Sequence, residues 1–543
     1  MRTAAGERGA AIGARRPRLP LLLAAPALAV VALLLAPIVY LAIRAGTGGG
    51  DAWEVLARAS TARLIGRTLG LAAAVSASSV AIGVPLAWLV TRTDLPARRT
   101  WFALASLPLV IPSYVAALAL IGAFSPRGLL QQVLEGPFGV ERLPEIYGFP
   151  GALLAVTLST VPYVFLLAAA AFRRVDPALE EAARGLGRSR LSTFATVTFP
   201  LVRPSVAAGA LIAALYAISD FGAVSLMRYD TLTRAIFTQY RSLLEREPAA
   251  VLGLLLVAIT SAILAVEAWA RGRGRIHRTT PGAGRRAAPV PLGRWRWPAL
   301  AAVAAVVAVL AAVPVAVLGY WLGRGLARGE DLALPVGPAV SSVLVALAAA
   351  ALALAAALPV AILAQRHRSP WTRSLERASY VSNALPGIVV ALALVFFTAR
   401  YLPVVYQTIP LLLVAYLIRY FPQALAGADG ALRSVDPRLE EAARGLGRGS
   451  LGVLWSVTLP LMRAGLVSGG TLVVLSVLRE LPATLVLRPI GFETLATEVW
   501  RETSVGAYSA AAVPALALML VALPVLYVAS RLQAAGEGPA PGS

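Results

Sequence analysis

The sequence contains no cysteine, and none of its 49 basic residues is lysine. Without cysteine the chain forms no disulfide bond and supplies no thiolate metal ligand or cysteine nucleophile. Without lysine it lacks the Gly-Lys-Ser/Thr sequence of a Walker A loop, so it binds no nucleotide through that loop. Its only histidines, His277 and His367, are expected in solvated loops. Two histidines also exclude zinc sites built from several histidine or cysteine ligands.

Charged residues are scarce for a chain of 543 residues. They make up 14% of it, and 58% of the residues are hydrophobic, whereas a soluble globular chain carries about 25% charged residues. This composition excludes disordered and collagen-like classes and indicates an integral membrane protein. The net charge of +22 sits in short arginine runs between apolar segments. That pattern is typical of positive-inside topology rather than of nucleic-acid binding.

Twelve stretches of the sequence are long and apolar enough to cross a membrane. They are approximately residues 19–43, 66–91, 101–124, 150–172, 204–227, 249–270, 298–322, 338–364, 379–398, 403–425, 465–487 and 507–530. The first is too long for the hydrophobic region of a cleaved signal peptide and is interpreted as a retained anchor. The predicted fold class is therefore an all-α integral membrane protein with twelve transmembrane helices.

The spans divide into two halves of six, residues 1–270 and 298–543, joined by a linker at 271–297. The linker is rich in arginine, glycine and proline and contains no acidic residue. We interpret it as a topology determinant and flexible tether; binding of anionic lipid is the alternative. Arginine-rich segments before the first span, between spans two and three, in the linker and between spans eight and nine fall on one side. Both termini are therefore expected to be cytoplasmic.

The two halves share a repeated segment. Val175–Arg188 reads VDPALEEAARGLGR and Val435–Arg448 reads VDPRLEEAARGLGR, so the two copies differ only at Ala178 and Arg438. Similarity continues in VTFPLVR and VTLPLMR, which extends the repeated regions to about 173–203 and 433–463. Chance does not produce such a match, and the halves are interpreted as homologous, with pseudo-two-fold symmetry.

The repeated segment predicts a helix, a turn and a second helix. Asp176 and Asp436 precede a proline, as an N-cap precedes proline at the first helical position. Acidic residues follow in the first turns, where they suit the positive end of the helix dipole. Gly187 and Gly447 can end the helix. Two near-identical surfaces with small residues predict a two-fold symmetric partner on the cytoplasmic side; a merely structural amphipathic loop is the alternative.

These residues resemble the EAA loop of ABC-importer permeases, whose pattern is E-A-A, three residues, glycine, nine residues, a branched apolar residue, any residue, leucine and proline. The second copy matches the whole pattern, and the first has Phe199 in place of the leucine. The matching residues are Glu181, Ala182, Ala183, Gly187, Val197 and Pro200, and Glu441, Ala442, Ala443, Gly447, Val457, Leu459 and Pro460. The resemblance implies the type I ABC-importer fold and two coupling helices that dock on ATPase subunits.

Further segments are similar to fused permeases of ferric-iron uptake systems. They are Ser219–Tyr240, Asn383–Phe397 and Arg479–Pro489. The resemblance implies a bacterial inner-membrane permease that is not an enzyme, with two copies of an ATPase that uses ATP and a periplasmic or lipid-anchored binding protein. It implies no cofactor on this chain and no partner beyond these and membrane lipid. Permeases for thiamine, phosphonate, sulfate or polyamine are alternatives within the family, and a secondary transporter with six-plus-six spans is an alternative outside it.

Charged residues inside spans are the best candidates for a translocation pathway, because each is costly in a membrane unless it is paired or hydrated. Asp220 in the fifth span and Glu480 in the eleventh lie 260 residues apart, which is also the offset of the repeat. We expect both to face the pathway from opposite halves. Two roles stay open: ion pairs with Arg479 or Arg419 that latch one conformation, or a negative lining for a cation. A structural polar contact between helices is the alternative to both.

Overall fold

The computed structural model describes residues 21–124, 128–139, 143–243, 246–272, 289–367 and 369–536. Regular structure in these ranges is helical, apart from one isolated bridge between Thr93 and Val290. Eleven of the described helices are long and apolar enough to cross a membrane, and a bent helix pair raises the number to twelve. The all-α membrane fold is therefore confirmed. His277, Glu141 and linker residues 273–288 lie outside the described residues, and the basic N-terminal segment does too.

Helices of the first half run from Leu21 to Gly272. They are α1 (Leu21–Thr47), α2 (Gly49–Ala57), α3 (Ala59–Arg92), α4 (Arg98–Ser106), α5 (Ser113–Phe124), α6 (Leu129–Phe138), α7 (Phe149–Arg174), α8 (Pro177–Gly185), α9 (Arg190–Thr193), α10 (Phe199–Ser219), α11 (Gly222–Leu226), α12 (Leu232–Thr238) and α13 (Arg246–Gly272). A single π-helical turn, Phe194–Thr198, joins α9 to α10.

Helices of the second half follow a similar order, with α14 and α15 in the place of α1. They are α14 (Arg296–Val307), α15 (Val313–Ala327), α16 (Val336–Arg366), α17 (Pro370–Ser379), α18 (Gly387–Tyr401), α19 (Ile409–Arg433), α20 (Pro437–Gly445), α21 (Ser450–Val453), α22 (Leu459–Leu478), α23 (Pro482–Leu487), α24 (Leu495–Ser504) and α25 (Tyr508–Gly536). The π-helical turn recurs at Leu454–Thr458. His367 follows α16 and is half-buried rather than fully solvated.

Besides the predicted spans that contain Asp220 and Glu480, two more are interrupted, which corrects the sequence prediction. The span predicted at 101–124 consists of α4, a short 3-10 turn at Leu107–Val110 and α5. The span predicted at 379–398 is bent by 100° between the 3-10 turn that ends at Ala384 and the start of α18. Each interruption contains a proline, Pro112 or Pro386, that has no N–H to continue a helix and restricts the residue before it.

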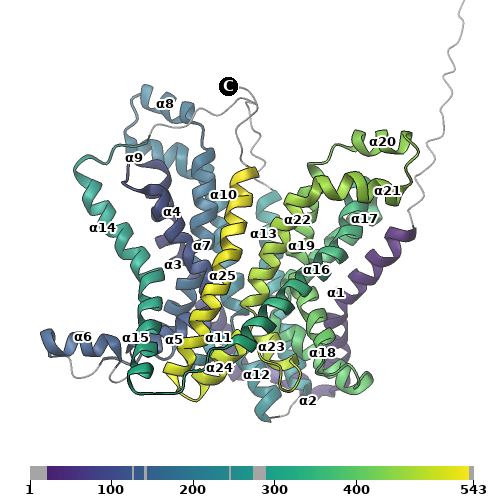
Figure 1. Cartoon of the computed structure of the whole chain (residues 1–543), viewed down its shortest axis with the longest axis horizontal. Coiled ribbons are helices and arrows are strands. Elements are labelled where there is room, and N and C mark those ends of the chain that lie inside the picture. The colour runs from purple at the N-terminus through teal and green to yellow at the C-terminus, as the bar shows by residue number, and fades with distance from the viewer. Residues whose placement is uncertain are drawn as a thin grey trace, which may run out of the picture.

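The two halves interlock, although the sequence divides cleanly between them. Helix α1 packs against α16, α17 and α18 of the second half, and α14 and α15 pack against α3, α4 and α5 of the first. In Figure 1 these first spans form the two flanks of the molecule. Each predicted half is therefore covered in space by the first span of the other half.

A three-helix bundle lies at the centre of each half, namely α3, α7 and α10, and α16, α19 and α22. Backbones touch where α19 crosses α22. A Cβ atom on Gly469 would lie 2.9 Å from the Cα of Gly427, and one on Gly427 would lie 2.6 Å from the Cα of Gly469. Small residues allow this approach, which is how membrane helices gain packing contacts without a hydrophobic driving force between them.

Candidate functional site

The repeated segment folds into a short helix, a glycine turn and a second helix in both halves. Asp176 accepts a hydrogen bond from the Ala178 N–H at 2.9 Å, and Asp436 accepts one from the Arg438 N–H at 3.0 Å. Each aspartate therefore satisfies a backbone donor that the helix leaves free. The predicted N-caps and helix ends are confirmed. Helices α8 and α20 stand at the same end of the molecule, one over each half, where α1 also begins and α25 ends (Figure 1).

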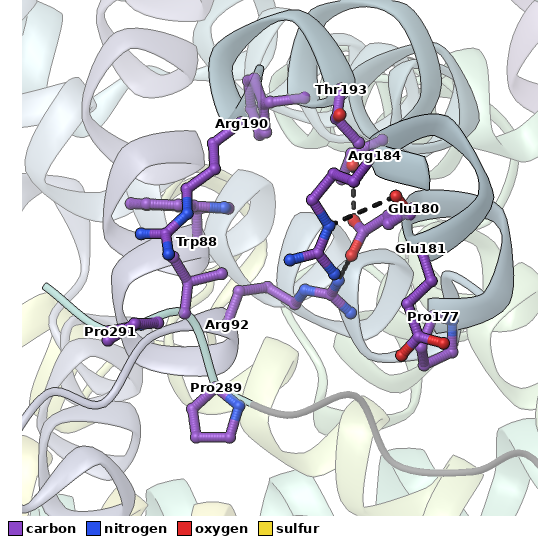
Figure 2. Close-up of a pocket in the computed structure, with 13 residues that line it drawn as sticks. Trp88, Arg92, Pro177, Glu180, Glu181, Arg184, Arg190, Thr193, Pro289 and Pro291 are labelled. Atoms are coloured by element: carbon purple, nitrogen blue, oxygen red, sulfur yellow. Dashed lines mark hydrogen bonds and ion pairs between the residues drawn. The ribbon is translucent and has the colours of Figure 1, made fainter. Parts of the chain in front are cut away.

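An ion pair fixes each of these helices to the bundle below it. Arg92, the last residue of α3, binds Glu180 of α8, and the Thr198 hydroxyl donates to the same carboxylate at 2.5 Å (Figure 2). Arg366, the last residue of α16, binds Glu440 of α20 at 3.1 Å. These charges are mostly buried, so removing one partner would leave the other uncompensated.

The sequence did not predict these ion pairs, and its pattern pointed instead to the next glutamate in each repeat. Glu181 and Glu441 are exposed, whereas Glu180 and Glu440 carry the contacts. One signal could have found them. Arg92 and Arg366 end the second span of each half, and an arginine at a membrane boundary is well placed to bind a repeated acidic residue nearby.

The outward face of α8 and α20 combines acidic, small and apolar residues. Ala182 and Ala442 are exposed beside the two outward glutamates, whereas Ala183 and Ala443 are buried against the bundle. At the turn that follows each helix, Leu186 and Leu446 are each 84% exposed. Exposure of apolar side chains to water is unfavourable, so this matched pair of leucines predicts a protein surface that covers both.

A pocket beside α8 is lined in part by residues that the second half does not repeat. Trp88, Arg184 and Arg190 line it together with Pro289–Pro291, the end of the linker (Figure 2). The Val290 N–H donates to the Arg92 carbonyl at 2.7 Å, which ties the linker to the end of α3. At the equivalent positions of the second half, Ile362 stands for Trp88 and Ser450 for Arg190.

Asp220 lies where α10 ends and α11 begins, not within a continuous span as the sequence predicted. Its carboxylate accepts hydrogen bonds from the N–H groups of Ala223 at 3.0 Å and Val224 at 3.2 Å, and from the Ser113 hydroxyl of α5. The side chain therefore caps α11. Hydropathy does not detect this break, because the residues on both sides of it are apolar.

Glu480 makes the equivalent break between α22 and α23. Its carboxylate accepts from the Ala483 N–H at 3.1 Å and from the Tyr420 hydroxyl. Gly387 stands where the first half has Ser113. A Cβ atom on Gly387 would lie 2.5 Å from Glu480 Oε1, so the longer glutamate uses the space that a serine would fill.

Both acids line a single cavity between the halves, the central cavity. It is also lined by tyrosines, two arginines and the residues at the helix breaks: Ser113, Tyr114, Tyr163, Tyr216, Ser219, Phe221, Gly222, Gly387, Arg419, Tyr420, Gln423, Ser476, Arg479, Leu481 and Pro482. Among the described residues, neither acid has an arginine nitrogen within 4 Å. The predicted ion pairs with Arg419 or Arg479 are therefore not formed in this state.

The chain matches the family model described as "Binding-protein-dependent transport system inner membrane component" twice, over residues 79–331 and 357–536. It is 30% identical over 488 residues to the Fe(3+)-transport system permease protein FbpB 2 of Haemophilus influenzae, covering 89% of this chain and 93% of that one. It is 24% identical to the ferric transport system permease protein FbpB of Actinobacillus pleuropneumoniae, over 76% of this chain and 63% of that one.

Shorter matches involve permeases for other substrates. The probable molybdenum ABC transporter permease protein HVO_B0370 of Haloferax volcanii is 35% identical, over 40% of this chain and 76% of its own length. Among solved structures, a bacterial ABC transporter involved in the import of the acidic polysaccharide alginate is 18% identical. That match has a TM-score of 0.34 and covers 42% of this chain and 85% of the other.

Proposed function

The chain belongs to the family of inner membrane components of binding-protein-dependent transport systems and is a permease subunit of an ABC importer; from this premise we propose that it carries ferric iron. It is a transport subunit rather than an enzyme. The observation that carries the substrate proposal is the match to an Fe(3+)-transport permease along nearly the whole of both chains. The molybdenum permease, by contrast, matches only 40% of this chain.

Coupling to ATP hydrolysis is assigned to α8 and α20. Two copies of a separate ATPase subunit would each receive one of these helices, and ATP would be bound by those subunits rather than by this chain. The symmetric glutamates, alanines and glycine turns support this assignment, namely Glu181, Ala182, Ala183 and Gly187, and Glu441, Ala442, Ala443 and Gly447. The ion pairs of Glu180 and Glu440 would transmit a push on either helix directly to α3 or α16.

The translocation pathway is assigned to the central cavity, with Asp220 and Glu480 at its wall. The two acids sit at equivalent helix breaks, and such breaks allow short segments to move against long helices. A binding protein would deliver the substrate at the end of the molecule opposite α8 and α20. Alternating access would then follow from closure of the two ATPases under those helices.

Orientation follows from the same assignment. Helix α1 begins and α25 ends beside α8 and α20, so both termini are proposed to be cytoplasmic in a bacterial inner membrane, surrounded by lipid. A phosphatase that is active only outside the cytoplasm should be inactive when fused after Gly536 and active when fused within the loop after Ser504. An active fusion after Gly536 would contradict the orientation and the docking of ATPases on α8 and α20.

Uptake measurements test the substrate. Cells that lack their own ferric permease would express this chain with a ferric-binding protein and an importer ATPase. We expect uptake of radioactive Fe³⁺ that requires all three proteins, and no stimulation of radioactive molybdate or sulfate uptake. Stimulated molybdate or sulfate uptake without iron uptake would refute the iron assignment and leave the family membership intact.

A further inference from the structure

The acids of the central cavity are already engaged by the protein. Every oxygen of the Asp220 and Glu480 carboxylates accepts at least one hydrogen bond, from a backbone N–H of α11 or α23 or from the hydroxyl of Ser113 or Tyr420. A bare metal cation would have to compete with these donors and loosen the caps of two helices. The carboxylates are therefore poorly placed to hold an unaccompanied cation.

The two arginines of the same cavity, by contrast, have hydrogen-bond donors without a partner among the described residues. Arg419 donates one hydrogen bond, from Nη1 to the Leu385 carbonyl at 2.5 Å, and its buried Nε has no protein partner among the described residues. Arg479 donates from Nη2 to the Tyr216 hydroxyl at 3.4 Å, and its Nε is likewise buried without a partner. Neither guanidinium has a carboxylate oxygen within 4 Å in the described part of the chain.

An arginine side chain carries five N–H donors and no acceptor, and it stays charged in proteins. Both side chains are half-buried, and a buried N–H donor such as each Nε is costly to leave without an acceptor. The Tyr114 hydroxyl is a third buried group without a partner among the described residues. All three groups line the central cavity, so its unused hydrogen-bonding capacity points to an acceptor with negative charge.

Arrangement of the two halves strengthens this assignment. The second half supplies both guanidiniums, from α19 and from the break after α22. The first half supplies phenols: the rings of Tyr163 and Tyr216 lie 6.1 Å apart, and the Arg479 guanidinium carbon lies 6.0 Å from the Tyr216 ring centroid. Guanidiniums bind carboxylate and phosphate oxygens through parallel hydrogen bonds, and tyrosine hydroxyls can add further donors.

We propose that the central cavity is a transient binding site for an oxyanion, in which Arg419 and Arg479 hold the anion. On the proposed function, this means that ferric iron crosses as a complex whose outer atoms are carboxylate or phosphate oxygens, not as a bare ion. The identity of the cargo as a ferric complex rests on the proposed function. The anion site itself rests only on the geometry of the cavity.

Equilibrium binding to the purified full-length chain in detergent tests the site. The probes are radioactive phosphate and radioactive citrate, each with and without Fe³⁺. We expect binding that falls at least tenfold in Arg419→Gln and in Arg479→Gln and is lost in the double variant. Arg479→Lys should retain part of the binding because it keeps the charge but not the planar fork. Arg400→Gln, an arginine at the end of α18 that does not line the cavity, is the matched control.

Two outcomes overturn the proposal: no binding of either anion to the wild-type chain, or equal binding in the wild-type and doubly substituted chains. Thermal unfolding of each variant shows whether a loss reflects the site or the fold, and the lysine variant keeps the test decisive if a glutamine variant unfolds. Binding that requires Fe³⁺ identifies a ferric complex as the ligand, and binding without it identifies a free oxyanion. Iron uptake by the assembled importer is measured separately, so failure of the iron assignment leaves the anion result readable.

Discussion

Replacing Gly187 and Gly447 with valine is expected to abolish transport while the chain still inserts and folds. Both glycines have a positive φ, +83° and +82°. In each turn the glycine N–H donates to the carbonyl of Arg184 or Arg444. The N–H of the next residue donates to the carbonyl of Ala183 or Ala443 at 3.2 Å. This is a Schellman motif. A β-branched residue is a genuine outlier at such a φ, and the strain costs about 1–3 kcal/mol per site.

Strain, not steric contact, is the cause of the expected effect, because nothing lies within 4 Å of a Cβ built on either glycine. Relief of the strain would turn α8 and α20 away from their present direction and move the exposed leucines after them. The ATPase would then lose its matched pair of contacts. Membrane insertion depends on the apolar spans and should not change.

Three measurements on the same variants separate these effects: membrane content of the chain, recovery of the ATPase with it, and substrate uptake. Gly449→Val is the matched control, because Gly449 lies in the same loop with φ −67° and ψ 165°, an extended backbone that valine accepts readily. We expect normal recovery and uptake for the control. Normal uptake by the Gly187→Val/Gly447→Val double variant would contradict the coupling role of these turns.

Local features of the repeated segment could be predicted because local chemistry determines them. Aspartate before proline specifies a helix start, and a glycine two residues after the last helical residue specifies its end, so α8 and α20 form as the sequence indicates. The ion pairs of Arg92 and Arg366 could not be predicted in the same way. Each joins residues more than 70 positions apart in sequence, and only the folded bundle brings them together.

Span prediction was limited by what hydropathy measures. It finds apolar length, so it located the membrane segments, but it is blind to the breaks at Asp220 and Glu480. It also cannot say which helices pack together. The exchange of α1 and α14–α15 between the halves depends on side-chain packing over the whole molecule. The repeat correctly indicated that the two acids are equivalent, yet only the folded chain puts Arg419 and Arg479 in the same cavity, each with its Nε unpaired among the described residues.

Removing both cavity charges, by Asp220→Asn together with Glu480→Gln, should lower uptake and at the same time tighten anion binding. Amide side chains keep the shape and an acceptor oxygen for the caps of α11 and α23. The formal charge of the acids and arginines in the cavity changes from zero to +2. Two unit charges roughly 10 Å apart interact with about 1.7 kcal/mol at an effective dielectric constant near 20. Each removed carboxylate charge would therefore take away about this much repulsion of a bound anion. That corresponds to more than tenfold in affinity.

Tighter binding slows release, so a site that should hold its ligand transiently would retain it and uptake would fall. A negative lining for a bare cation predicts the opposite change in affinity: removal of the acids would weaken the ligand's binding. The sign of the affinity change in the purified double variant therefore shows whether Asp220 and Glu480 offset the charge of the two arginines or form a negative lining for a bare cation. Phosphate and citrate binding, with and without Fe³⁺, would be measured beside iron uptake by the assembled importer. Unchanged affinity together with unchanged uptake would exclude both roles and leave the acids as helix caps alone.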